Sequence, residues 1–151
     1  MYFKTTKSPL GPLTIFADAK NIIALEFGST TREKPSSLLQ DASNQLNAYF
    51  KGHLNYFNLP LKTSGTVFQQ AVWNFILKIP YGTTLSYGDV AYKLKSSPRS
   101  VGGACGKNPI PIIIPCHRVL AANGKIGGFS AGFGISSKTS LLQIEGIKND
   151  F

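Results

Sequence analysis

The sequence predicts an α/β N-terminal domain, made of a short antiparallel sheet and one helix, followed by a mainly α-helical C-terminal domain with a helix-turn-helix. The first third of the chain consists of short apolar or β-branched segments separated by turn residues, which is typical of strands. From residue 66 onward the apolar residues recur at helical spacing. Residues 52–65 contain glycine, proline and serine without a helical period, so they mark a boundary. We therefore place the two domains at residues 1–62 and 63–151.

The N-terminal domain is expected to begin with three strands, at residues Tyr2–Thr6, Leu13–Ala17 and Ile22–Phe27. Pro35 and the two serines after it favour the start of a helix. One face of that helix is apolar and carries Leu38, Leu39, Ala42, Leu46, Tyr49 and Phe50. Gly52 ends the helix and opens a predicted linker over residues 52–65.

A capping box marks the first helix of the C-terminal domain. Thr66 and Gln69 form this box, and Pro80 ends the helix. Its apolar face is expected to consist of Val67, Phe68, Ala71, Val72, Phe75, Ile76 and Ile79. Trp73 lies on the same helix, and we expect its side chain in the core.

Two short helices and a last longer one are predicted after this. Ser86 and Asp89 form a second capping box, for a helix that runs to about residue 95. Ser97, with Pro98 at the first helical position, starts another that runs to about residue 107. A turn of about three residues joins these two helices, which makes them a helix-turn-helix candidate. The last helix is expected to begin near Ser136 or Ser137, to bury Leu141, Leu142 and Ile144, and to end at Glu145-Gly146.

The net charge of +9 is concentrated in the C-terminal part. Residues 1–65 carry seven basic and four acidic side chains, or +3, whereas residues 66–151 carry nine and three, or +6. This excess indicates a polyanionic partner, most simply nucleic acid, although a soluble protein of high pI is the alternative. No apolar stretch reaches the ~20 residues that a membrane span needs, and the start lacks the apolar core of a secretion signal. With only two cysteines, we expect a reduced, cytoplasmic protein, or a nuclear one in a eukaryote.

The segment Pro115-Cys116-His117-Arg118-Val119 carries the clearest chemical signal. A cysteine becomes a good nucleophile near neutral pH once its pKa falls somewhat below about 8.5. His117 supplies a candidate base next to Cys116 in the sequence. The apolar run at residues 110–114, which ends at Pro115, indicates a thiol held rigidly in a dry pocket.

Glycines make the second helix of the helix-turn-helix unusual. Gly102, Gly103 and Gly106 lie within it, and the two adjacent glycines each cost about 1 kcal/mol relative to alanine in a helix interior. Side chains are therefore excluded there because another backbone approaches closely. That backbone is either a second helix or the sugar-phosphate wall of a DNA groove, and the sequence leaves both open.

A set of motifs in this part of the chain resembles the O6-alkylguanine-DNA alkyltransferases. In chain order they are Arg99-Ser100-Val101-Gly102-Gly103-Ala104, Asn108-Pro109, Ile114-Pro115-Cys116-His117-Arg118-Val119, a Gly-Phe-Ser loop, and Leu141-Leu142-x-x-Glu145-Gly146. The resemblance covers about residues 66–146 and is weaker before them. It implies that residues 1–62 form the RNase H-like domain of that family.

The resemblance implies repair of O6-alkylguanine in double-stranded DNA, with O4-alkylthymine as a second candidate substrate. The family flips the damaged guanine out of the duplex and moves its alkyl group to a cysteine, here Cys116. The expected activity is that of a methylated-DNA--[protein]-cysteine S-methyltransferase. Because a thioether is a poor leaving group, transfer is irreversible and stoichiometric, and the protein is consumed. We expect a monomer that needs no cofactor and no metal.

The resemblance also implies roles for individual residues around the acceptor. His117 would act as a base through a water, and Glu145 would orient and polarise it. Tyr87 would donate a hydrogen bond to the purine N3. Arg99 would fill the space that the flipped base leaves. Asn108 would be the hinge between the recognition helix and the active-site segment.

The remaining implied residues contact the DNA or line the guanine pocket. The recognition helix would enter the minor groove, with Ser100 and Gly102 against the DNA. The guanine pocket would be lined by Val119, Phe129, Ser130 and Lys138. The family's Tyr-Ser-Gly flap is Phe129-Ser130-Ala131 in this chain, a departure that bears on the width of the pocket.

Other classes of protein fit the sequence less well. An alkyltransferase-like damage sensor lacks the acceptor cysteine, a transcription factor would need neither Cys116 nor Glu145, and a thiol hydrolase would need an oxyanion-hole motif. Zinc is disfavoured because adjacent Cys116 and His117 give poor geometry for one ion. Cys105 is expected to serve in packing, and whether it pairs with Cys116 is left open.

Overall fold

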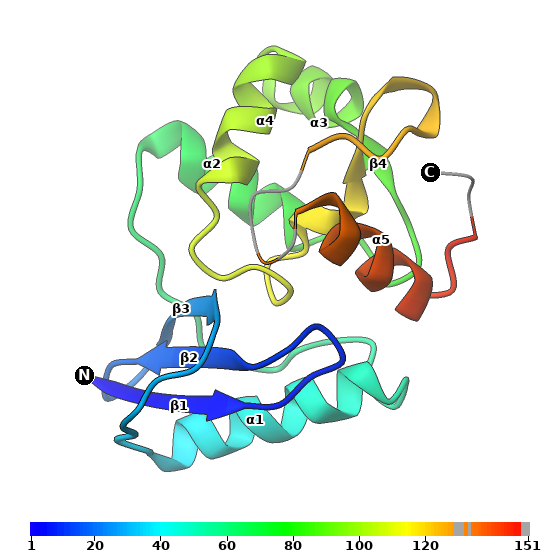
Figure 1. The fold of residues 1–151 in the computed structure, drawn as a ribbon. Helices are drawn as coiled ribbons and strands as arrows, with labels where there is room; N and C mark the ends of the chain where they lie inside the picture. The colour runs from blue at the N-terminus through cyan, green and yellow to red at the C-terminus, as the bar shows by residue number, and fades with distance from the viewer. Residues whose placement is uncertain (129–131, 133, 149–151) are drawn as a thin grey trace. The chain divides into compact units, whose positions relative to one another are not determined.

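The computed structural model describes residues 1–128, 132 and 134–148. The chain divides into two compact units, Met1–Thr63 and Ser64–Phe151 (Figure 1). Among the helices of the described residues, none is long and apolar enough to cross a membrane.

Unit 1 is a three-stranded antiparallel sheet with one helix packed against it (Figure 1). Its strands are β1 (Tyr2–Thr6), β2 (Leu13–Ala17) and β3 (Ile22–Phe27), with β2 in the centre. The predicted bounds of all three strands are confirmed. The helix α1 (Ser37–Phe50) begins after Ser36, whose side chain accepts a hydrogen bond from the backbone N–H of Leu39. It contacts β1 and β2.

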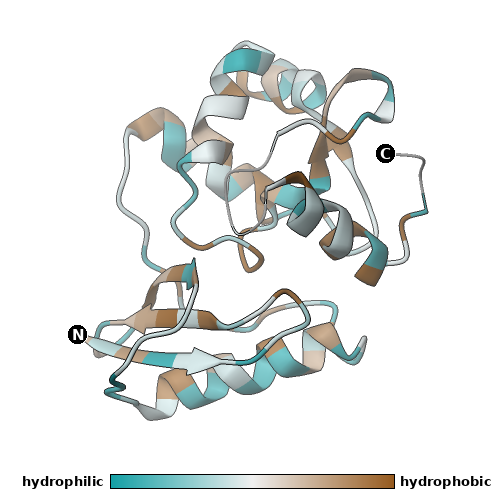
Figure 2. Cartoon of the chain, in the orientation of Figure 1, coloured by the Kyte–Doolittle hydropathy of each residue, from teal (hydrophilic) through white to brown (hydrophobic). Residues whose placement is uncertain are grey.

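The core of unit 1 lies between β2 and the apolar face of α1. Figure 2 shows hydrophobic and hydrophilic residues alternating along α1, as expected for a helix with one buried face. Residues from both elements are fully withdrawn from solvent: Leu13, Ile15, Ala17, Leu39, Ala42, Leu46 and Tyr49. Burial of these side chains holds helix and sheet together.

The predicted linker over residues 52–65 is wrong for its middle part. The backbone N–H of Ile22 donates to Pro60 O at 2.8 Å, and Lys62 N donates to Ile22 O at 2.9 Å. Residues 60–62 are therefore bound to β3 and belong to unit 1. A single bridging residue leaves no periodic pattern in the sequence, which is why composition alone suggested a linker.

Four α-helices form the described part of unit 2: α2 (Val67–Ile76), α3 (Tyr87–Leu94), α4 (Pro98–Gly106) and α5 (Ile135–Ile144). Both predicted capping boxes form, and Ser97 caps α4 as expected. The turn between α3 and α4 passes through Lys95, which has a left-handed backbone with φ of 54°. Trp73 is 2% exposed, and its Nε1 donates to Ala104 O at 2.9 Å, which ties α2 to α4.

The end of α2 differs from the prediction, whereas the start of α5 agrees closely with it. α2 stops at Ile76, short of residue 79, and the predicted core residue Val67 is 89% exposed because it is the first residue of the helix. The N-cap of α5 is Gly134, with φ of 65° and no side-chain cap. The helix begins at Ile135, which confirms the predicted start near Ser136 to within one residue.

A parallel pair of two-residue strands in unit 2 was not predicted. β4 (Leu85–Ser86) pairs with β5 (Val119–Leu120), with Leu85 opposite Val119. Strands this short show no alternation in the sequence. Their pairing places the start of α3 beside the residue that follows the Cys116-His117-Arg118 segment, and so brings two parts of the candidate site together.

Candidate active site

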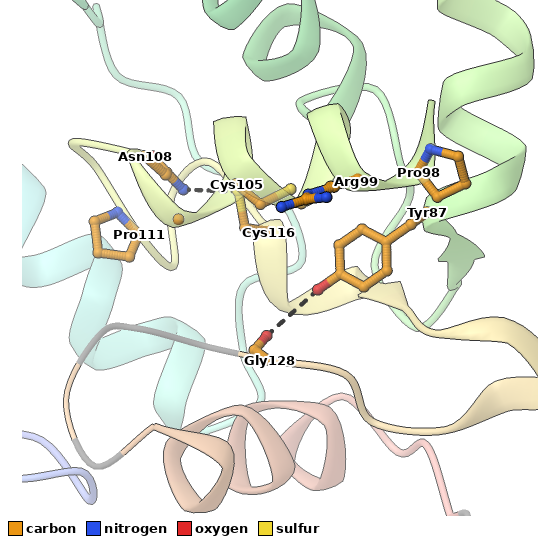
Figure 3. Close-up of a pocket in the computed structure, with 10 residues that line it drawn as sticks. Tyr87, Pro98, Arg99, Cys105, Asn108, Pro111, Cys116 and Gly128 are labelled. Atoms are coloured by element: carbon orange, nitrogen blue, oxygen red, sulfur yellow. Dashed lines mark hydrogen bonds between the residues drawn. The ribbon is translucent and has the colours of Figure 1, made fainter. Parts of the chain in front are cut away.

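A pocket of about 610 Å³ in unit 2 is lined by five of the residues that the sequence predicted for the site, namely Tyr87, Arg99, Gly102, Asn108 and Cys116 (Figure 3). Its walls come from α3, from α4, from the loop after α4 and from the cysteine segment. The described lining residues are Tyr87, Pro98, Arg99, Gly102, Cys105, Gly106, Asn108, Pro111, Cys116 and Gly128. The fold thus brings Cys116, Asn108, Tyr87 and Arg99 to one cavity.

Asn108 holds the thiol of Cys116 in place. Cys116 is 3% exposed and opens the 3-10 helix η1 (Cys116–Arg118). The Nδ2 amide of Asn108 donates to Cys116 Sγ at 3.1 Å and to Ile114 O at 2.9 Å. The backbone N–H of Asn108 donates to Cys105 O at 3.2 Å. One residue therefore connects the end of α4 to the cysteine segment.

The apolar run before Cys116 is buried and contains a strained residue. Ile112 has φ of 75°, which a β-branched residue rarely adopts, and it is 1% exposed. It lies within a turn in which Ile114 N donates to Ile110 O at 2.9 Å, and a second turn follows in which Cys116 N donates to Ile114 O at 2.8 Å. Burial of the isoleucines stabilises this conformation, because relaxing it would expose apolar surface. The thiol is thus held by a rigid, dry segment.

His117 and Glu145 form a fully buried pair behind the thiol. His117 Nε2 and Glu145 Oε2 lie 2.6 Å apart. Because Nε2 faces a carboxylate, we assign the hydrogen of the neutral ring to Nε2, which leaves Nδ1 as the basic nitrogen. Burial lowers the pKa of His117, and the bond to Glu145 only partly opposes this effect. The imidazole is therefore neutral near pH 7 and able to accept a proton.

Arg118 belongs to the same cluster, and sequence reasoning missed it. Its Nε donates to Glu145 Oε1 at 2.8 Å and its Nη2 to Oε2 at 3.1 Å, while Nη1 donates to Ile79 O at 2.7 Å. This two-point contact fixes both oxygens of Glu145 in the orientation that His117 needs. A signal existed in the sequence: an arginine in a buried segment needs a carboxylate, and residues 66–151 hold only three acidic side chains.

Tyr87 and Lys138 meet on the other side of the pocket. Lys138 Nζ donates to Val119 O at 2.7 Å, to Gly128 O at 3.1 Å and to the Tyr87 hydroxyl at 3.2 Å. The Tyr87 hydroxyl in turn donates to Gly128 O at 3.4 Å. Burial raises the pKa of Tyr87 to about 12 and lowers the pKa of Lys138 to about 8. Tyr87 therefore keeps its hydrogen and remains a donor at neutral pH.

Four further residues were predicted to line the guanine pocket: Val119, Phe129, Ser130 and Lys138. Val119 and Lys138 are fully buried and are not among the described residues that line the pocket. Lys138 binds both the carbonyl of Val119 and the hydroxyl of Tyr87, which does line it. Phe129 and Ser130 lie outside the described residues.

The outer face of α4 is exposed and bears the predicted DNA-contacting residues. Arg99 and Ser100 are exposed in its first turn. A Cβ on Gly102 would meet the Tyr87 ring at 4.0 Å, and a Cβ on Gly103 would meet no described atom within 4 Å. Packing against a second helix therefore does not explain Gly103 within the described part of the chain.

Cys105 lines the same pocket as Cys116. Interaction between the two thiols lowers the pKa of Cys105, and the same interaction together with burial raises the pKa of Cys116. Cys116 is therefore protonated in the resting pocket and needs a base to become a nucleophile. Within the residues that the structure describes, no three His, Cys, Asp or Glu side chains gather as a metal site would require.

These features define a class of protein with a candidate cysteine nucleophile, whose buried thiol opens onto a pocket beside an exposed helix and has a histidine and a carboxylate behind it. The particular family follows from comparison with known proteins. The chain belongs to the 6-O-methylguanine DNA methyltransferases, because the model of their ribonuclease-like domain matches residues 1–63 and that of their DNA binding domain matches residues 67–147.

Relatives from distant organisms cover nearly the whole chain. A methylated-DNA--protein-cysteine methyltransferase of Methanosarcina acetivorans is 41% identical over 156 residues, which span 97% of this chain and 99% of the relative. One of Mycobacterium tuberculosis is 42% identical over 154 residues, with 96% and 92% covered.

Two solved structures show the same fold. The crystal structure of Mycobacterium tuberculosis OGT in complex with DNA superposes with a TM-score of 0.86 at 43% identity, covering 96% of this chain and 92% of that one. The O6-methylguanine-DNA methyltransferase of Pyrococcus kodakaraensis gives a TM-score of 0.62 at 25% identity, with 96% and 99% covered.

Proposed function

We propose that this protein repairs O6-alkylguanine in DNA by transferring the alkyl group directly to Cys116. The observation that carries the proposal is the buried Cys116 thiol, which opens onto a pocket and has the His117–Glu145 pair behind it. Membership of the 6-O-methylguanine DNA methyltransferase family supports the substrate, and the relatives are named for methyl transfer to a protein cysteine. The protein is thus a methylated-DNA--[protein]-cysteine S-methyltransferase.

In the reaction Cys116 Sγ attacks the alkyl carbon, and the bond from that carbon to guanine O6 breaks as the C–S bond forms. The proton of the thiol passes through a water to Nδ1 of His117, and Glu145 stabilises the imidazolium. The electron pair of the broken bond stays on guanine, which takes up a proton and is restored in the DNA. Overall the alkyl group and the thiol hydrogen change places. The thioether does not leave again, so each molecule acts once.

Tyr87 is the donor that assists departure of the guanine. Its raised pKa, about 12, keeps the hydroxyl protonated, so it donates to the purine N3 as negative charge develops on the ring. Lys138 positions this hydroxyl from behind, at 3.2 Å, while its bond to Val119 O anchors α5 to β5. Asn108 keeps the thiol aligned with the same space.

DNA would bind along α4, with α3 and α4 acting as a helix-turn-helix whose second helix enters the minor groove. The exposed Arg99 and Ser100, and the absence of a side chain at Gly102 and Gly103, support close approach of a backbone. Arg99 lines the pocket mouth and would replace the flipped base, offsetting part of the few kcal/mol that unstacking costs. The structure of the Mycobacterium tuberculosis relative with DNA supports DNA as the partner.

The organisation of the chain completes the proposal. We infer an RNase H-like domain at residues 1–62 and a DNA-binding and alkyl-transfer domain at residues 63–151, in a monomer. The matches of the two domain models to residues 1–63 and 67–147 support this division. The site of action would be the cytoplasm, or the nucleus in a eukaryote.

Alkyl transfer is tested by peptide mass mapping after incubation with duplex DNA that contains O6-methylguanine. One added methyl group is expected on the peptide that contains Cys116, with restored guanine in the DNA. Cys116→Ser should leave the lesion intact, whereas Cys105→Ser should still carry the adduct on Cys116. A methyl group on Cys105, or an intact lesion with the unchanged protein, would overturn the proposal.

Base flipping is tested by comparing two substrates. Arg99→Ala should slow transfer from duplex DNA far more than transfer from a free alkylated guanine base, because only the duplex must be opened. Lys107→Ala removes an equal charge from the end of the same helix and is the matched control. At saturating DNA it should transfer at the unchanged rate. Equal losses on both substrates for Arg99→Ala would refute the role of Arg99.

A further inference from the structure

Cys105 and Cys116 line the same pocket and lie close together in the close-up view (Figure 3). We propose that they are a site of oxidation, at which a peroxide converts the two thiols into a reversible disulfide. The disulfide would close the alkyl acceptor to its substrate. The effect on alkyl transfer rests on the proposed function, whereas formation of the bond does not.

The fold brings the two thiols to one pocket. Both cysteines line that pocket, the thiols interact closely enough to shift each other's pKa, and the disulfide forms when the two sulfurs close to about 2.05 Å. Asn108 fixes the backbones on either side, since its N–H donates to Cys105 O at 3.2 Å and its Nδ2 donates to Cys116 Sγ at 3.1 Å. Both cysteines are free thiols in the structure.

The two thiols differ in a way that sets the order of events. Cys105 is partly exposed in α4, whereas Cys116 is 3% exposed at the base of the pocket. An oxidant that enters from solvent therefore meets Cys105 first. Interaction with Cys116 also lowers the pKa of Cys105, and the thiolate is the form that reacts with peroxide.

The chemistry balances with one molecule of hydrogen peroxide. The Cys105 thiolate attacks a peroxide oxygen, the O–O bond breaks, and a sulfenic acid and hydroxide form. The sulfur of Cys116 then attacks the sulfenic sulfur, the S–S bond forms, and the second hydroxide leaves. The two thiol protons convert the hydroxides to water, so two thiols and one peroxide yield one disulfide and two waters. A dithiol reductant returns two electrons and two protons and restores both thiols.

A disulfide between Cys105 and Cys116 would protect Cys116 from irreversible oxidation as well as block alkyl transfer. An isolated cysteine that forms a sulfenic acid is open to further oxidation to sulfinic acid, which thiol reductants do not reverse. With Cys105 in contact, the sulfenic acid is consumed by the neighbouring thiol instead. After such oxidation, reduction of the disulfide would return Cys116 to a free thiol that has not been alkylated.

The experiment treats the full chain with a small excess of hydrogen peroxide and maps peptides without reduction. A disulfide between the Cys105 and Cys116 peptides is expected, with an intact mass lower by about 2 Da. Methyl transfer from duplex DNA should be lost in the treated protein and restored by dithiothreitol. Because the readout by mass does not depend on transfer, failure of this proposal is distinguishable from failure of the proposed function.

Cys105→Ala is the decisive variant, because the chain contains no third cysteine. The methyl-transfer activity of peroxide-treated Cys105→Ala is compared with that of untreated Cys105→Ala. Peroxide should cause a loss that dithiothreitol does not restore, and Cys116 should carry two or three added oxygens. The proposal fails if the unchanged protein shows no linked peptide, if its disulfide joins two chains, or if dithiothreitol restores both proteins equally.

Discussion

Replacing Glu145 by glutamine should destabilise the protein strongly, because it removes the only charge that balances a buried arginine within the described cluster. The Glu145 carboxylate accepts hydrogen bonds from His117 Nε2, from Nε and Nη2 of Arg118, and from the backbone N–H of Gly82 at 3.1 Å. Glutamine keeps one acceptor oxygen but turns an NH₂ group toward two of these donors. The guanidinium, 6% exposed with its residue, then has no counter-charge.

The expected loss in the free energy of unfolding follows from the contacts that Glu145 makes. Removing one partner of a buried ion pair costs about 3–5 kcal/mol, mostly because the other charge stays buried and unpaired. Total stability is about 5–15 kcal/mol for a protein, so the loss is a large fraction. At about 2–4 °C per kcal/mol for a chain of this size, the melting temperature should fall by about 10 °C.

Urea unfolding monitored by Trp73 fluorescence measures the change. Trp73 lies in the same unit and is 2% exposed. Glu33→Gln is the matched control, because Glu33 is exposed and its bond to the backbone of Thr5 survives in glutamine. It should change the free energy of unfolding by no more than about 0.5 kcal/mol.

A double-mutant cycle with Arg118→Met separates charge from packing. If the unpaired guanidinium causes the loss, Glu145→Gln with Arg118→Met should be more stable than the sum of the two single changes predicts. A loss below about 1 kcal/mol for Glu145→Gln alone would refute the reasoning. So would strictly additive losses in the double variant.

The remaining predictions concern Tyr87 and its surroundings. Tyr87→Phe should slow single-turnover methyl transfer by about 10²-fold with little change in DNA affinity, because it removes a donor that acts in the transition state; an unchanged rate would exclude that donor. Gly127→Ala should also slow transfer, since a Cβ there would lie 2.9 Å from the Tyr87 ring. Gly124 has a similar positive φ, +74° against +69° for Gly127, but a Cβ there would meet no described atom within 4 Å. Gly124→Ala should therefore lose similar stability but transfer the methyl group at the normal rate. Burial lowers the pKa of Lys138 to about 8. Between pH 8 and about 10.5 the unfolded chain therefore binds more protons than the folded one, and the free energy of unfolding should rise with pH. In urea unfolding at pH 8 and pH 10, Lys138→Met should lack this rise, and identical pH profiles would contradict it.

Much of the fold and of the candidate site could be predicted because the signals are local. Strands β1 to β3 are short alternating or β-branched segments, and the helix starts at Thr66, Ser86 and Ser97 depend on residues no more than three positions away. The nucleophile was equally accessible, since Cys116 and His117 are adjacent and lie in a distinctive apolar segment. A catalytic motif made of contiguous residues can be recognised without knowledge of tertiary contacts.

The sequence by itself therefore determined the order of the elements, their capping, the acceptor cysteine and the family it resembles. The tertiary structure alone decided which distant side chains meet: Arg118 with Glu145 across 27 positions, Lys138 with Tyr87 across 51, and Cys105 with Cys116. Such contacts depend on how several elements pack at once, so no local pattern encodes them. The two-residue strands β4 and β5 and the bridge at residues 60–62 escaped prediction for a related reason. They are too short to show a period and form only because a neighbouring segment lies beside them.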